Sequence, residues 1–185
     1  SLQDSVDIGI YPGLSYAPET NLSLGVFALI ILKNKSNNYG YTPNLISPKM
    51  VYTLNNQSIL TLDGSFFTKK NSRIDTKIKY SNYPDYFFGL GNTNDPNIKE
   101  LFKRQFISTK GFVMKEITSN LYAGALFDFD YSILRDFIPN GLLSQDNPSG
   151  LRGGYAVGAG IGLTFDDRDQ ILYPRKGKFI QIGTR

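Results

Sequence analysis

The charged residues that could do chemistry are most concentrated in the run Asp166-Asp167-Arg168-Asp169. Three carboxylates so close together could bind Ca²⁺, but the run lacks the spaced loop of oxygen ligands that calcium sites use. An arginine between carboxylates can instead form bidentate ion pairs at the end of a strand. We therefore predict a structural motif at this position, with no metal ion and no cofactor.

Other catalytic chemistry is restricted by composition, because the sequence has no Cys and no His. Thiolate nucleophiles, thiolate zinc sites and Ser-His-Asp triads are thereby excluded. A pair of carboxylates such as Asp128 and Asp130 could suggest glycoside hydrolysis. At spacing i, i+2 they lie on one face of a strand, which is typical of residues that line a lumen. We expect no enzymatic activity.

Charge and hydropathy restrict the partners. The formal net charge is +4, and the basic residues are scattered singly or in pairs such as Lys69-Lys70 and Lys103-Arg104. No basic stripe marks a nucleic-acid groove, so we expect no nucleic-acid partner. No apolar stretch is long enough for a transmembrane helix. Transmembrane strands remain open, because they alternate lipid-facing and lumen-facing residues and so have an ordinary mean hydropathy.

Period-two alternation is the main structural signal, and it is clearest from Val157 to Asp166. One face of this segment is apolar, and the other is small or polar with Gly158, Gly160 and Gly162. A length of about ten residues matches a tilted strand that crosses a bilayer. The apolar face would then meet lipid and the glycine face the lumen. The apolar set comprises Val157, Ala159, Ile161, Leu163 and Phe165.

Similar segments recur along the whole chain and predict an all-β, antiparallel transmembrane β-barrel architecture. Tight turns are expected at Ala17–Thr20, Asn55–Gln57 and Thr118–Asn120. Long polar connections near 84–100 and 135–154 would lie on the extracellular side, and the Thr118 turn and the turn around Tyr173 on the periplasmic side. The stretch 33–46 is a long exception on the periplasmic side. Nine strands are expected, near Asp7–Tyr16, Leu22–Leu32, Ser47–Leu54, Ile59–Thr68, Arg73–Tyr83, Phe102–Ile117, Leu121–Leu134, Tyr155–Asp166 and Lys178–Arg185.

The segment after the glycine-alternating strand carries the most specific motif. Pro174 breaks strand pairing and Gly177 permits positive φ, so together they would fix a turn. Tyr173 beside this turn suits a membrane interface. The residues that make up the motif are Asp166, Arg168, Asp169, Tyr173, Pro174 and Gly177.

This succession resembles the signature of the BamA/TamA superfamily, also called the bacterial surface antigen family. In that family a glycine-alternating strand leads into Asp-x-Arg-Asp and then Tyr/Phe-Pro-x-x-Gly. Two further segments support the resemblance: Pro12–Gly25 is similar to the first barrel hairpin, and Tyr86–Asn92 to an aromatic-glycine run. The resemblance covers the whole chain, in the expected order.

The resemblance implies a location in the bacterial outer membrane and a barrel of sixteen strands, of which this chain supplies the N-terminal half. Residues 1–185 would form a single barrel domain or half-barrel, without a POTRA domain. Full-length relatives insert outer-membrane proteins or transport polypeptides. The implied partners are outer-membrane lipid, client proteins and a completing barrel half or second copy.

Two other classes of protein stay open. One is a passive outer-membrane barrel: a pore, or the membrane anchor of a patatin-like lipase. The other is a soluble β-sandwich that serves as a binding module. A naturally short barrel that closes with about eight strands is also compatible with the sequence.

Overall fold

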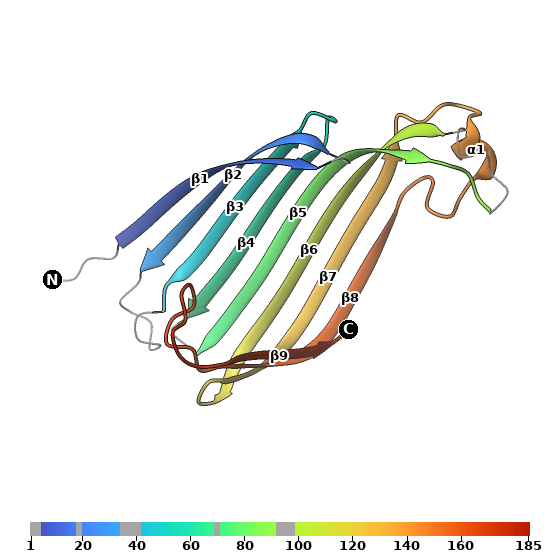
Figure 1. The fold of residues 1–185 in the computed structure, drawn as a ribbon. Coiled ribbons are helices and arrows are strands. Elements are labelled where there is room, and N and C mark those ends of the chain that lie inside the picture. The colour runs from blue at the N-terminus through green and yellow to red at the C-terminus, as the bar shows by residue number, and fades with distance from the viewer. Residues whose placement is uncertain (1–4, 18–19, 34–41, 69–70, 92–98) are drawn as a thin grey trace.

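The computed structural model describes residues 5–17, 20–33, 42–68, 71–91 and 99–185. These residues form one antiparallel sheet of nine strands in chain order, each paired with the next (Figure 1). The same described residues include one short helix, between the seventh and eighth strands. The elements are β1 (Ser5–Ala17), β2 (Asn21–Lys33), β3 (Asn44–Thr53), β4 (Ser58–Thr68), β5 (Ser72–Phe87), β6 (Glu100–Thr118), β7 (Leu121–Arg135), α1 (Leu142–Asp146), β8 (Gly154–Asp166) and β9 (Phe179–Thr184).

The predicted all-β class and all nine predicted strands are confirmed. The largest difference in bounds is at β5, which continues through Pro84 to Phe87. Proline has no N–H to donate to a neighbouring strand. Beyond Asn82, however, β5 pairs only with β6, so its other edge has no hydrogen-bond ladder for Pro84 to interrupt.

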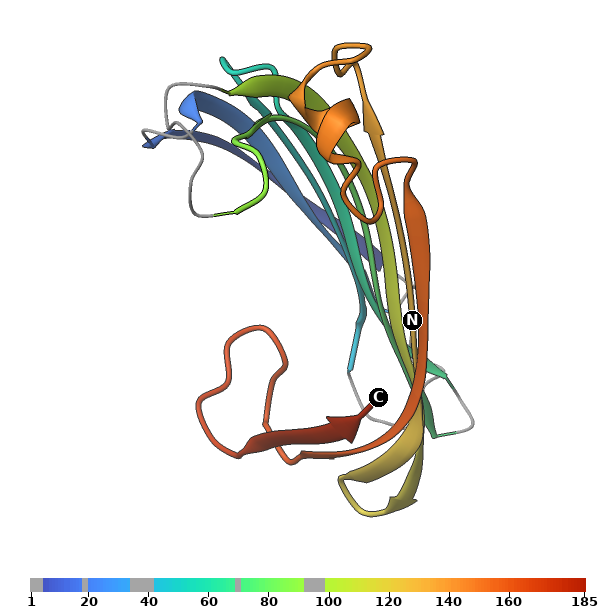
Figure 2. The same cartoon turned by 90° about the vertical axis from the view of Figure 1, so that its right-hand side faces the viewer.

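The sheet is strongly curved and is not closed, so β1 and β9 form its two outer strands (Figures 1 and 2). Its connections lie at the two ends of the strands. We call the end with the β1–β2, β3–β4, β5–β6 and β7–β8 connections the loop edge, and the opposite end the turn edge. The predicted turn at Pro18-Glu19 and parts of the connections 33–46 and 84–100 lie outside the described residues. The described helix is too short and too polar to cross a membrane.

The two faces of the sheet differ in chemistry. Side chains on the convex face are predominantly apolar and exposed, and Ile161 and Ile182 are 71% and 70% exposed. The concave face is mixed: it carries charged and small residues, with buried Arg73, Ser108 and Thr164, and also apolar side chains such as Leu29 and Val51 on β2 and β3. Because side chains alternate along each strand, this division follows directly from the period-two pattern of the sequence.

In β8 the predicted division into an apolar and a glycine face is confirmed. Val157 and Ile161 are each 71% exposed on the convex face, whereas Thr164 is fully buried on the concave face. The glycines permit close approach there. A Cβ at Gly160 would lie 1.9 Å from the backbone oxygen of Thr184, and one at Gly162 would lie 2.8 Å from the Phe112 ring. The glycine row therefore lets β9 fold back over the sheet.

The concave face also contains a small apolar core beneath β9. Phe112, Met114, Tyr122 and Leu126 form this cluster on β6 and β7. The alternation in β6 is irregular in sequence because Phe112 and Met114 share a face with Lys110. The structure accommodates this mixture, since the apolar pair lies at the turn edge under β9 and Lys110 lines a neighbouring polar cavity.

Candidate functional site

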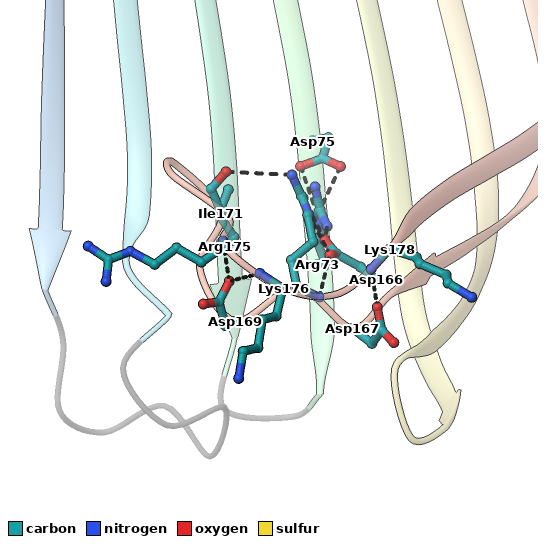
Figure 3. Close-up of polar contacts among 10 residues, drawn as sticks. Arg73, Asp75, Asp166, Asp167, Asp169, Ile171, Arg175, Lys176 and Lys178 are labelled. Atoms are coloured by element: carbon teal, nitrogen blue, oxygen red, sulfur yellow. Dashed lines mark hydrogen bonds and ion pairs between the residues drawn. The ribbon is translucent and has the colours of Figure 1, made fainter.

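The segment from Asp166 to Lys178 joins β8 to β9 and bends inward over the concave face, in front of β4 and β5 (Figures 2 and 3). Arg168 makes a bidentate pair with Asp166, from Nε to Oδ1 at 2.7 Å and from Nη2 to Oδ2 at 2.8 Å. Arg73 of β5 donates from Nη1 to the same carboxylate at 2.9 Å. One carboxylate thus connects two arginines that lie far apart in sequence.

Arg73 extends this connection across the sheet. Its Nε donates to Asp75 Oδ1 at 3.1 Å, and Ser65 of β4 donates to that same oxygen at 2.7 Å. The side chains of Arg73 and Asp166 are each only 7% exposed. We call the set Arg73, Asp75, Asp166 and Arg168 the arginine clamp, since it fastens the turn to β4 and β5.

Two aromatic rings enclose the clamp. The guanidinium of Arg73 lies 5.3 Å from the centre of the Phe67 ring and 5.9 Å from that of Phe179. The guanidinium of Arg168 lies 4.5 Å from the Phe179 ring centre. These rings favour the cations through their quadrupoles and exclude water from the ion pairs, which strengthens the electrostatic attraction.

The backbone of the turn is held by its own carboxylates (Figure 3). Asp169 Oδ1 accepts the backbone N–H groups of Arg175 at 2.9 Å and Lys176 at 3.2 Å, and Asp167 accepts that of Lys178. Gly177 has φ +97°, and a Cβ there would lie 2.4 Å from the Asp167 carbonyl oxygen. Only glycine fits this position without strain.

These contacts shift the ionisation of two groups. The backbone N–H groups of Arg175 and Lys176 lower the pKa of the Asp169 carboxyl below its ordinary value. The hydrogen bonds to Asp166 raise the pKa of Arg168 and outweigh burial, which would lower it. Both shifts favour the charged forms, so the turn is held together by permanent charges at neutral pH.

The predicted motif residues have different surroundings. Asp166 and Arg168 form the clamp, and Asp169 and Gly177 shape the turn. Pro174 and Tyr173 lie at its exposed tip, where Tyr173 is 76% exposed. The bidentate pair expected of Arg168 is present, and its partner is Asp166, two residues earlier, rather than the adjacent Asp167 or Asp169.

Sequence reasoning missed Arg73, Asp75 and Phe179 as members of the site. The shared face of Arg73 and Asp75 was visible from their i, i+2 spacing. Nothing in the sequence, however, connects position 73 with position 166, because the contact depends on how far β9 folds back. The pairing of Phe179 with Asp166 in the β8–β9 ladder then places this ring on the clamp.

The concave face offers no metal site within the described residues, where no group of three His, Cys, Asp or Glu side chains could hold an ion. Asp128 pairs with Arg185 at 2.8 Å. A polar cavity of about 340 Å³ lies between the sheet and β9, and Asp63, Asp75, Lys77, Lys110 and Arg185 contribute its charged lining. Both carboxylates of this lining, Asp63 and Asp75, are ion-paired, which favours a structural role over general acid–base chemistry.

A second anchored segment lies at the loop edge. Glu100, 4% exposed, accepts the backbone N–H of Ile138 at 2.8 Å through Oε1 and that of Leu143 at 2.8 Å through Oε2. Asp146 accepts the N–H of Leu90 at 2.9 Å, so the β5–β6 and β7–β8 connections are joined. Glu100 therefore orders the β7–β8 loop that the sequence predicted only as long and polar.

Comparison of the chain with protein-family models, with curated proteins and with solved structures gave no match.

Proposed function

We propose that this chain forms part of an outer-membrane β-barrel of the BamA/TamA type, which inserts outer-membrane proteins or transports polypeptides. The observation that carries the membrane assignment is the apolar convex face. In the central part of the sheet its side chains are aliphatic, aromatic, glycine, proline or threonine, as at Met50, Leu62, Ile78 and Val113. A contiguous exposed apolar surface of this extent marks contact with lipid or with another protein.

Strand length supports contact with lipid. The eight strands β1 to β8 contain between 10 and 19 residues each. A tilted strand needs about 9–11 residues to cross the hydrocarbon region, and globular strands are commonly about 5–6 residues long. Every one of these eight strands is therefore long enough to span a bilayer.

A row of tyrosines supports a membrane interface at the loop edge. Each lies on the convex face within a few residues of the loop-edge end of its strand, and each is at least partly exposed. Aromatic rings of this kind sit at the level of lipid headgroups in outer-membrane barrels. The row comprises Tyr16, Tyr52, Tyr86, Tyr131 and Tyr155.

The concave face has the properties of a water-facing lumen. Asp63 lies 3.5 Å from Lys49 and 3.4 Å from Lys77, so a line of charges crosses β3, β4 and β5. Such charges are tolerated in a hydrated barrel interior and would be costly against lipid. A soluble β-sandwich buries its apolar face against a second sheet, whereas the apolar face of this sheet is exposed.

The role in assembly or transport comes from the resemblance and is supported by the open sheet. The outer edge of β1 presents unpaired backbone groups, and such an edge can template an incoming strand. Closure would require further strands from a longer chain or from a second copy. The alternative of a passive barrel shares the membrane assignment and differs only in what the barrel does.

Refolding of the barrel, together with the strands that close it, into phosphatidylcholine vesicles tests the membrane assignment. We expect an SDS-resistant form with shifted electrophoretic mobility that needs lipid or detergent, whereas a lipid-independent soluble monomer would contradict the membrane assignment.

Epitope tags test the orientation: a tag near Asn147 should be accessible on intact cells and a tag near Gln170 should not. Depletion of the protein tests its role. Loss of an assembly factor should lower the levels of several unrelated outer-membrane proteins, and loss of a passive barrel should not.

A further inference from the structure

Cationic side chains interrupt the apolar convex face at its loop-edge rim. Lys103 of β6 and Arg135 of β7 lie directly opposite each other in register. Arg135 donates from Nε to Gln105 Oε1 at 3.0 Å, and Lys103 pairs with Asp136 at 2.7 Å. Arg135 is thus oriented by a neutral partner and keeps its charge, whereas Asp136 compensates the charge of Lys103.

A third cation lies farther along the same rim. Lys99 directly precedes β6, and its ammonium lies 4.4 Å from the centre of the Tyr86 ring. Lys99 and Lys103 are four residues apart on the same face, which corresponds to about 13 Å at the rise of a β-strand. The rim therefore presents two cationic points: Arg135, beside the Lys103–Asp136 ion pair, and Lys99.

The surroundings restrict what can approach these cations. They border the apolar surface of Ile107, Phe129 and Tyr131, which would meet acyl chains. Tyr86 belongs to the row of tyrosines that supports a headgroup level at this edge. The cations thus lie where the headgroups of an adjacent lipid would lie, directly above its chains.

We propose that this rim binds an outer-leaflet glycolipid whose disaccharide headgroup carries a phosphate at each end. Arginine recognises phosphate through its planar fork, and lysine contributes a point charge. One phosphate would contact Lys103 and Arg135, and the other Lys99. This inference rests on the proposed membrane location, because it needs the loop edge to face the outer leaflet.

Charge complementarity and spacing favour this lipid over a phospholipid. A single phosphate satisfies one cationic point and leaves the other unused. A headgroup with two separated phosphates engages both points at once, while its several acyl chains cover the apolar surface between β5 and β7. The site should therefore discriminate by the number of phosphates.

The test compares lipid A carrying two phosphates with lipid A carrying one, each titrated against the protein in zwitterionic detergent and followed by native mass spectrometry. We expect tighter binding of the doubly phosphorylated form. Lys99→Gln should weaken its binding by about fivefold, and the double variant Lys103→Gln/Arg135→Gln by about 25-fold, since each basic residue near a headgroup contributes about fivefold. Lys115→Gln is the matched control, because it removes a convex cation at the turn edge and should change nothing.

Equal affinity for the two lipids, or equal competition by phosphatidylglycerol, would overturn the inference. Failure of the proposed function is recognised separately. Refolding into uncharged phosphatidylcholine vesicles does not depend on these cations, so a protein that refolds there and ignores phosphate number refutes only the lipid site. A protein that refolds in no vesicle refutes the membrane assignment as well.

Discussion

Leu62 and Ile78 lie side by side on the convex face and need only an apolar environment, whereas Arg73 and Asp166 on the concave face depend on specific partners. The convex face needs only an apolar composition, so many apolar side chains would serve equally well there. The concave face depends on the geometry of particular pairs of side chains. The convex face should therefore tolerate apolar exchange and reject charge, and the concave face should tolerate new charge and reject the loss of a partner.

The largest effect is expected for Leu62→Lys. A lysine on the lipid face near the middle of a barrel strand costs about 2–4 kcal/mol. The matched variant is Ser47→Lys, which adds the same charge on the concave face opposite Asp63. We expect Leu62→Lys to reduce the SDS-resistant fraction strongly and Ser47→Lys to leave it nearly unchanged. Equal behaviour of the two variants would contradict the assignment of the faces.

Removal of Arg73 should have the next largest effect. Arg73→Ala leaves Asp75 without its cation and removes one of two arginines from Asp166, which we estimate to cost about 2–3 kcal/mol. Arg168→Ala should cost about 1–2 kcal/mol, because that side chain is less buried. Urea unfolding in detergent micelles measures both, with Arg73→Lys as the conservative control. A smaller effect for Arg73→Ala than for Arg168→Ala would show that β5 does not anchor the turn.

Glu100→Gln should have a smaller, local effect at the loop edge. Glutamine keeps one acceptor oxygen but turns an NH₂ group toward the second backbone N–H, which costs about 1–2 kcal/mol. Hydrogen exchange should accelerate at the amides of Ile138 and Leu143 and stay constant in β8. Faster exchange throughout the sheet would show instead that the loop and the sheet unfold together.

The smallest effect is expected from acid. Because its folded-state pKa is lowered, the Asp169 carboxylate stabilises the turn fully above its unfolded-state pKa. This contribution is lost as the pH falls below that ordinary value and through the lowered one. The protection factors of the Arg175 and Lys176 amides against hydrogen exchange should therefore fall in that acidic range. Asp169→Asn should remove the pH dependence of the protection of these two amides while leaving the arginine clamp intact.

The contrast between the faces also explains what the sequence could predict. Alternation in β8 gave both the strand and its division into faces, because side-chain direction follows from the backbone alone. The positive φ at Gly177 could likewise be predicted from the local sequence. The contact of Arg73 with Asp166 was not predictable, since it spans 93 positions and depends on the curvature of the sheet. The anchoring of the β7–β8 loop by Glu100 was missed for the same reason.

The convex face should meet lipid, and the concave face should meet water. Single cysteines in this cysteine-free chain test this directly: Val157→Cys and Ile161→Cys on the convex side, and Gly158→Cys on the concave side, where a Cβ lies an ordinary 3.5 Å from Asp128. In vesicles, a membrane-embedded apolar reagent should label the first two and a water-soluble maleimide the third. The opposite pattern, or labelling of all three by the water-soluble reagent, would contradict the account.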